Sequence, residues 1–190
     1  MALTFTNKAA KEMKDRIMQL VDPHAARNVW MGTFHSIFAK ILRIEAQHLG
    51  FTSDFTIYDT DDSKQLINTI LKERELDTKA YPAKYILHRI SMAKSALYTA
   101  EDYCNNFEIQ QQDLRANKPL VGEIFKSYNN RLLRANAMDF DDILFYTNVL
   151  LRDFPEILYK YQQRFEYIWV DEYQDTNYAQ YLIIKRIAAM

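Results

Sequence analysis

The sequence is poor in the residues that cross-link or break a chain. Its 190 residues include one cysteine, Cys104, three glycines and four prolines. One cysteine excludes an internal disulfide, and no Cys/His spacing matches a zinc site. The scarcity of glycine and proline argues against a disordered chain. No apolar run is long enough to cross a membrane and no signal peptide is recognisable at Met1, so we expect a cytoplasmic protein without membrane contact.

Charge is nearly balanced overall but unevenly distributed. The formal net charge is −1, and 48% of the residues are hydrophobic, which is ample for the core of one or two domains. Residues 1–43 carry seven Lys/Arg against three Asp/Glu, whereas residues 135–190 carry five against nine. This asymmetry suits a protein that contacts phosphates in one region and a metal in another. Charged faces are more often simply solvated.

Apolar periodicity predicts an α/β fold in which helices predominate. We expect short parallel strands at residues 3–5, 29–31 and 166–170, each leading into a helix. Residues 55–134 show helical periodicity with few candidate strands, which predicts an all-α insertion between strands of one sheet. The predicted organisation is therefore an α/β part at 1–50 and 135–190, interrupted by a helical part at 51–134.

The most informative segment is F-E-Y-I-W-V-D-E-Y-Q-D-T-N, residues 165–177. An apolar run typical of a strand stops at two adjacent carboxylates, Asp171 and Glu172. Ligands of open parallel sheets bind beyond the carboxyl ends of the strands. One carboxylate that positions Mg²⁺ and a second that activates water are what nucleotide hydrolysis requires. For a bare Asp-Glu pair, a solvated acidic turn is the simpler explanation. Asn177 and Gln180 predict a capping box for the next helix.

The run V-D-E-Y-Q-D-T-N resembles the second helicase motif (Walker B) of UvrD/Rep/PcrA-type superfamily 1 DNA helicases. Three more blocks resemble this family in the same order along the chain: L-T-F-T-N-K-A-A at 3–10 (motif Ia), G-T-F-H-S at 32–36 (motif Ib) and M-D-F-D-D-I-L at 138–144. The resemblance implies a partial RecA-like P-loop NTPase domain. Subdomain 1A would comprise 1–50 and 135–190, and the helical insertion 1B would comprise 51–134.

The resemblance also implies roles for the acidic residues. Asp171 would position Mg²⁺ and the nucleotide, Glu172 would act as the general base beside the nucleotide, and Gln174 would relay the state of the nucleotide to the DNA side. By contrast, Asp141 and Asp142 are best explained as the first turn of a helix, where the helix dipole favours carboxylates.

Single-stranded DNA would contact motifs Ia and Ib through Phe5, Asn7, Lys8, Thr33, His35 and Ser36. A ring can stack on a base, a lysine can neutralise a phosphate, and polar side chains can donate to the backbone. Structural explanations compete for several of these residues. Phe5 suits a core, either Thr6 or Asn7 suits the cap of the first helix, Thr33 suits a helix cap, and His35 suits an ordinary helix start.

The glycine-rich phosphate loop G-x-x-x-x-G-K-[ST] is absent, because glycine occurs only at 32, 50 and 122. In the resembled family this loop precedes motif Ia, so we expect a piece of a larger motor. The parent would use ATP and Mg²⁺ to move 3′-to-5′ on single-stranded DNA and to open duplex at junctions. We expect the piece itself to hold no cofactor, to lack ATPase activity and to bind DNA weakly.

An incomplete sheet would expose an edge, which leaves self-association open. One alternative function is a helicase-like remnant that serves as a DNA- or protein-docking module. Another is an all-α interaction domain whose motif matches are accidental.

Overall fold

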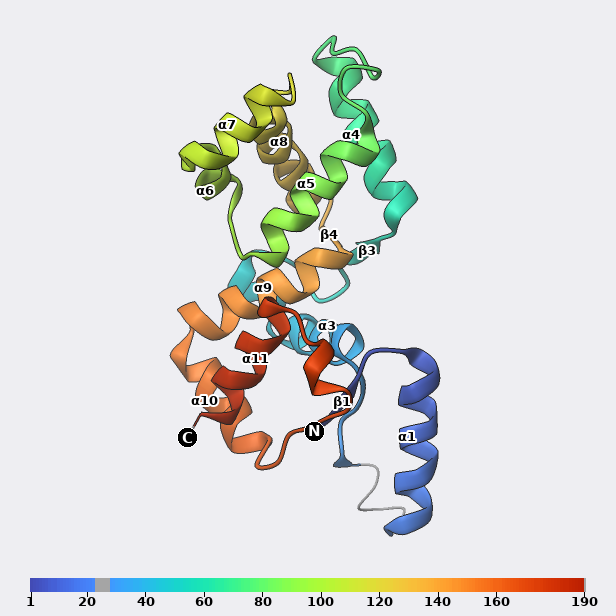
Figure 1. Cartoon of the computed structure of the whole chain (residues 1–190). Helices are drawn as coiled ribbons and strands as arrows, with labels where there is room; N and C mark the ends of the chain where they lie inside the picture. Colours follow the sequence, from blue (N-terminus) through green and yellow to red (C-terminus); the bar gives the residue numbers. More distant parts are fainter. Residues whose placement is uncertain (23–27, 190) are drawn as a thin grey trace. The chain divides into compact units, whose positions relative to one another are not determined.

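The chain divides into two compact units. The computed structural model describes residues 1–22 and 28–189. Unit 1 comprises Met1–Leu49 and Tyr146–Met190, and unit 2 comprises Gly50–Phe145. Figure 1 traces the helices and strands of both units along the chain. Among the described residues, no helix is both long and apolar enough to span a membrane.

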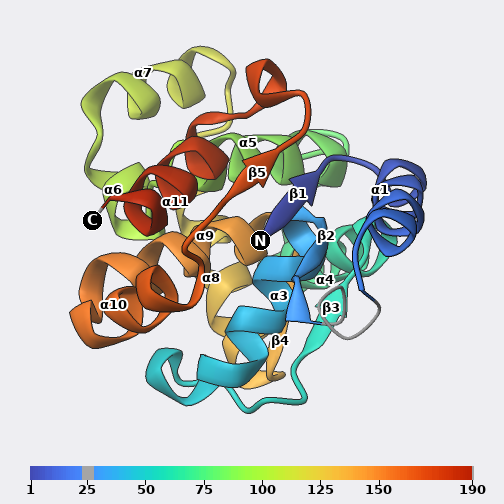
Figure 2. The same ribbon diagram turned by 90° about the horizontal axis from the view of Figure 1, so that it is seen from below.

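Unit 1 contains a three-stranded parallel sheet in the order β2-β1-β5. The strands are β1 (Ala2–Thr4), β2 (Met31–Thr33) and β5 (Trp169–Val170). Figure 2 shows β1 beside β5. The parallel strands confirm the predicted fold class, with three corrections. Strand β1 lies one residue earlier than predicted and β2 lies two residues later. Strand β5 is shorter than predicted because it pairs only with Ala2 and Leu3 of β1.

The helices of unit 1 differ in how firmly they are held. They are α1 (Asn7–Leu20), α3 (Phe34–Glu45), the end of α9 (Phe140–Asp153), α10 (Pro155–Arg164) and α11 (Tyr178–Ala188). Helix α3 buries a complete apolar face at helical spacing, which includes Phe34, Phe38 and Ile41. In α1, by contrast, no side chain from Asn7 to Leu20 is buried.

A buried carboxylate joins two helices of unit 1. Glu45, at the end of α3, accepts a hydrogen bond from Lys160 Nζ at 2.6 Å and from Tyr161 Oη at 2.9 Å, both on α10. A buried charge is tolerated only when it is paired and hydrogen-bonded, and both conditions are met here. A 3-10 helix (Ala46–Leu49) follows α3, and Gly50 then adopts φ +79°, a left-handed conformation that glycine favours after a helix end.

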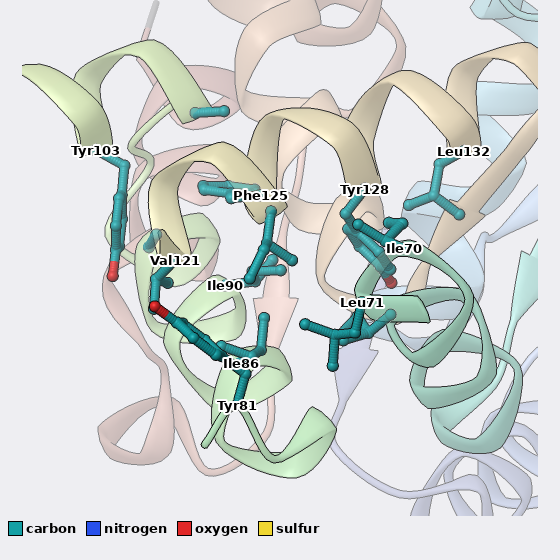
Figure 3. Packing of buried hydrophobic residues seen from close by; sticks show 14 of the residues in the cluster. Ile70, Leu71, Tyr81, Ile86, Ile90, Tyr103, Val121, Phe125, Tyr128 and Leu132 are labelled. Atoms are coloured by element: carbon teal, nitrogen blue, oxygen red, sulfur yellow. The ribbon is translucent and has the colours of Figure 1, made fainter. Parts of the chain in front are cut away.

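Unit 2 is mostly helical and overlaps the insertion predicted at 51–134, but it extends to Phe145. Its helices are α4 (Thr60–Glu73), α5 (Ala83–Ser95), α6 (Ala100–Asn105), α7 (Phe107–Arg115) and α8 (Val121–Arg134). The apolar stripes of α4, α5 and α8 meet in one core, shown in Figure 3 with Leu71, Ile90 and Phe125 among its members. Helical periodicity predicted these stripes correctly because each repeats every three to four residues.

A small parallel sheet in unit 2 was not predicted. Strand β3 (Thr56–Tyr58) pairs with β4 (Ala137–Asp139), in register Thr56↔Ala137. Each strand has three residues, which is too short to show the alternation that reveals a strand in the sequence. The two partners also lie about eighty residues apart, so no local signal indicates the pairing.

An ion-pair cluster with little solvent exposure lies where β4 meets α9. Asp139 and Asp142 cap the start of α9 reciprocally, with backbone-to-carboxylate distances of 3.0 and 2.8 Å. Lys94 of α5 places its Nζ 2.7 Å from a carboxylate oxygen of each, and its side chain is 1% exposed. The dipole explanation of Asp142 was therefore incomplete, because this carboxylate is also a buried partner of Lys94.

Protonation of the Lys94 cluster is set by two opposing effects. Burial lowers the pKa of Lys94, but the two adjacent carboxylates outweigh burial and raise that pKa overall. Burial, reinforced by the charge of Asp139, raises the pKa of Asp142 to about 7. In Asp139, Lys94 outweighs burial and lowers the pKa of the carboxyl. The two carboxylates thus share one ammonium group, and the carboxyl of Asp142 has a higher pKa than that of Asp139.

Candidate functional site

The segments predicted to carry function leave the sheet of unit 1 at one edge. Thr4 of β1 lies opposite Thr33 of β2, and Leu3 lies opposite Val170 of β5. Because the strands are parallel, the residues that follow each strand lie at the carboxyl edge, where ligands of such sheets bind. The structure therefore brings together the segments around Phe5, Thr33 and Asp171.

The acidic loop begins directly after β5. Asp171 and Glu172 are both exposed, and Glu172 has φ 52° and ψ 47°, a left-handed conformation that costs a non-glycine residue about 1–3 kcal/mol. Gln174 Nε2 donates a hydrogen bond to Glu172 Oε2. Strain of this kind is concentrated at functional sites and switch regions. The loop thus presents two carboxylates at the sheet edge and holds one of them with an amide.

Asp171 is attached to the central strand by backbone and side chain. Its backbone N–H donates to the carbonyl of Leu3 at 2.9 Å, and the hydroxyl of Thr4 donates to its Oδ2 at 3.4 Å. Thr4 was not among the residues predicted to carry function. A hydroxyl at a strand position within motif Ia is the signal that could have identified it.

The exit of β1 exposes the polar residues of motif Ia. Thr6, rather than Asn7, caps α1, because its Oγ1 accepts from the backbone N–H of Ala9 at 3.1 Å. Asn7 and Lys8 are exposed in the first turn of the helix, where free amides and the dipole favour anions. Phe5 is half-buried, with its ring centroid 5.2 Å from that of Phe34. This segment therefore offers an amide, an ammonium and part of a ring.

The exit of β2 is more tightly organised. Thr33 is buried and caps α3 through Oγ1, which accepts from the N–H of Ser36 at 3.2 Å, and the Ser36 hydroxyl donates to the Thr33 carbonyl at 2.9 Å. A Cβ on Gly32 would lie 2.5 Å from Ser36 Oγ, so glycine makes room for that hydroxyl. Thr33 thus has the predicted capping role, whereas Ser36 is exposed.

His35 is partly buried at the same helix start. Burial lowers the pKa of its imidazole to about 4. The side chain is therefore neutral at physiological pH, and any contact with a phosphate at this position would be a hydrogen bond rather than an ion pair.

The carboxylates do not form a complete metal cage. Within the described part of the chain, no cluster of three or more His, Cys, Asp or Glu side chains could hold a metal ion. Magnesium keeps several waters and is usually bound by one or two carboxylates together with substrate phosphates. The exposed carboxylate of Asp171 is chemically suited to such an ion.

Comparison with known proteins decides the family. The sequence model of the UvrD/REP helicase N-terminal domain matches residues 1–190, the whole chain. The chain belongs to the UvrD/REP helicase family. The UvrD/REP assignment agrees with the motif resemblance and rejects an all-α domain with accidental matches. The parallel strands of unit 1 exclude that alternative independently.

Individual UvrD/REP relatives are similar over nearly the whole chain. Identity is 39% over 188 residues to the ATP-dependent DNA helicase PcrA of Leuconostoc citreum, covering 99% of this chain. It is 41% over 188 residues to the ATP-dependent DNA helicase UvrD1 of Mycobacterium leprae, covering 98%, and 40% over 188 residues to PcrA of Bacillus subtilis, covering 99%. Each match covers 24% of the relative, so this chain spans about a quarter of the length of these helicases.

Proposed function

We propose that this chain is the N-terminal part of an ATP-dependent DNA motor that moves 3′-to-5′ on single-stranded DNA and separates duplex at junctions. The observation that carries the proposal is the position of Asp171 and Glu172. They follow a parallel strand at the edge of the sheet, beside the exits of β1 and β2. The direction of movement and the substrate rest on likeness to the UvrD/REP family.

On the nucleotide side, we assign Asp171 to positioning of Mg²⁺ and Glu172 to general-base catalysis. Magnesium, when bound, neutralises charge on the phosphates of ATP. A carboxylate at Glu172 can take a proton from an attacking water once its hydrogen bond from Gln174 is released or rearranged. Gln174 is thereby suited to couple the state of Glu172 to the rest of the loop.

On the DNA side, we assign the exits of β1 and β2 to the backbone and bases of a single strand. Exposed Asn7 and Lys8 suit phosphate contacts, and the accessible part of the Phe5 ring suits stacking on a base. His35 and Ser36 can add neutral hydrogen bonds. Thr33 acts through its cap, because its side chain is buried.

We further propose that unit 1 corresponds to part of subdomain 1A, and that unit 2 holds the helical subdomain 1B. The motor would work in the cytoplasm.

The catalytic assignment is tested in the longest polypeptide that the gene encodes. We expect DNA-stimulated ATP hydrolysis, and E172Q should lower kcat by about 100-fold or more, as for loss of a general base, with little change in KM. D171A should raise the Mg²⁺ requirement as well. The matched control is E166Q, an exposed carboxylate before β5, which should retain wild-type kinetics. Undiminished turnover in E172Q would remove the assigned base.

The 190-residue chain alone should release no phosphate from ATP, because the sequence has no phosphate loop. It should bind a fluorescent single-stranded oligonucleotide weakly, with an affinity that falls as salt rises. K8A should reduce the slope of log affinity against log salt concentration by about one, the change expected for one lost phosphate contact. K79A, which replaces an exposed lysine of unit 2, should leave that slope unchanged. Magnesium-dependent phosphate release by this chain, above that of E172Q, would contradict the first expectation.

An apolar groove in unit 1 leads us to propose self-association of the isolated chain. The groove has a volume of about 930 Å³ and is lined by α1, the residues just before β2 and the segment that leads into β5, including Leu20, Tyr167 and Trp169. Leu20 is 83% exposed and Trp169 69%, and apolar patches of this kind usually bind another surface. Sedimentation should show dimers at micromolar concentration, and W169E should dissociate them. A monomer at every concentration would end this proposal.

A further inference from the structure

Thr4 places a hydroxyl at a buried position of the sheet, where an apolar side chain is expected. It is the last residue of β1, the central strand, and it is 2% exposed. Valine has nearly the same shape and suits a buried strand better, because a hydroxyl taken out of water without a partner costs about 1–3 kcal/mol. The hydroxyl of Thr4 is directed at the carboxylate of Asp171, at 3.4 Å from Oδ2.

The carboxylate that receives this hydrogen bond is otherwise on the surface. Asp171 is exposed, and its backbone is fixed by the 2.9 Å hydrogen bond to the carbonyl of Leu3. The backbone bond sets where the residue lies but leaves its χ angles free to rotate. A hydroxyl on the rigid neighbouring strand restricts that rotation, and such supporting hydrogen bonds orient carboxylates that act on metal ions.

The same strand continues into the proposed DNA segment. One residue separates Thr4 from Thr6, the cap of α1, and Asn7 and Lys8 follow at once. A change in the conformation of residues 5–8 would therefore act on β1 directly beside the hydroxyl that donates to Asp171.

We propose that Thr4 is a positioning residue that orients the Asp171 carboxylate and links it to the DNA-facing end of β1. The inference rests on the proposed function of Asp171 as the residue that positions Mg²⁺. Thr4 itself touches neither nucleotide nor DNA in this proposal, and it acts only through the hydrogen bond to Asp171.

The first test uses the 190-residue chain and does not depend on catalysis. Hydrogen exchange of residues 171–176 is measured in wild type, T4V, T4S and D171A. T4V removes the hydroxyl and keeps the shape, whereas T4S keeps the hydroxyl. We expect faster exchange in T4V and D171A, wild-type exchange in T4S, and no further increase in the double variant T4V/D171A. Equal exchange in T4V and wild type, or additive effects in the double variant, would overturn the proposal.

The second test measures ATP hydrolysis by the longest polypeptide that the gene encodes. T4V should raise the Mg²⁺ concentration for half-maximal rate by about tenfold, the usual effect of removing a supporting hydrogen bond, and T4S should restore it. A T4V enzyme with wild-type Mg²⁺ dependence would contradict the role of Thr4. A wild-type polypeptide that hydrolyses no ATP would contradict the proposed function instead, and the exchange experiment would still decide the hydrogen bond.

Discussion

His35 is expected to remain neutral over the whole physiological pH range. Burial lowers its pKa from 6.5 to about 4, so the folded chain resists protonation that the unfolded chain accepts. The stability contributed by the neutral ring is present above pH 6.5 and is lost as pH falls toward 4. An NMR titration of the imidazole should give a midpoint near 4 in the folded chain and near 6.5 in urea. A folded-state midpoint near 6.5 would show that the ring is solvated.

Asp142 should make the stability of unit 2 depend on pH in the opposite sense. Its pKa is raised from 3.8 to about 7, so the folded state binds its proton more tightly than the unfolded state. The stabilisation is complete below pH 3.8 and is lost as pH rises toward 7. The pKa of Asp139 is lowered instead, so the stability that this carboxyl contributes is lost only as pH falls below its ordinary pKa.

The asparagine variant D142N imitates the protonated carboxyl and should remove the loss of stability between pH 4 and 7. At pH 8 it should be more stable than wild type, because the neutral amide avoids the cost of a second buried carboxylate charge. Denaturant unfolding across this pH range is the measurement, with E108Q, which replaces an exposed carboxylate of unit 2, as the control. A parallel pH profile in D142N and wild type would contradict the assignment.

At the scale of elements, the cap of α11 fixes the far side of the acidic loop. Asn177 accepts from the N–H of Gln180 at 2.9 Å, and the Gln180 side chain accepts from the N–H of Asn177 at 3.0 Å, which confirms the predicted capping box. N177A should lower the free energy of unfolding by about 1 kcal/mol, while N177S should retain most of it.

Hydrogen exchange in the first turn of α11 would show whether N177A destabilises this end of the helix locally. Because α11 starts three residues after Asp175, the acidic loop should exchange faster as well. A global loss of stability without a local change would show that the cap is not what holds this end of the loop.

Elements differ in how well the sequence predicts them. The caps at Thr33 and Asn177 and the apolar stripe of α3 were predictable, because each depends on residues within one or two turns. The pairing of β3 with β4 was not, because three-residue strands carry no periodicity and gain their hydrogen bonds from a distant partner.

At the scale of the whole molecule, the two compact units should unfold separately. K94M would leave two carboxylates buried without their ammonium partner, which costs about 3–5 kcal/mol. Both tryptophans, Trp30 and Trp169, lie in unit 1. K94M should therefore shift the far-UV circular dichroism transition, which reports both units, more than the tryptophan fluorescence transition.

The control for the unfolding experiment is K84M, an exposed lysine of unit 2, which should leave both transitions in place. Equal shifts of the circular dichroism and fluorescence transitions in K94M would mean that the units unfold as one cooperative body.

The sequence alone determined the family of this protein and its local structure around the helix caps. Motif order identified the helicase resemblance. The run that ends at Asp171 and Glu172 indicated a strand leading to an acidic loop, because hydrophobic periodicity and helix capping depend on residues close together in the chain. Only the tertiary structure showed that Thr4 donates to Asp171 and that Lys94 is shared by Asp139 and Asp142. These contacts join residues 45 or more positions apart in the chain, and strand pairing and burial alone decide which of them meet.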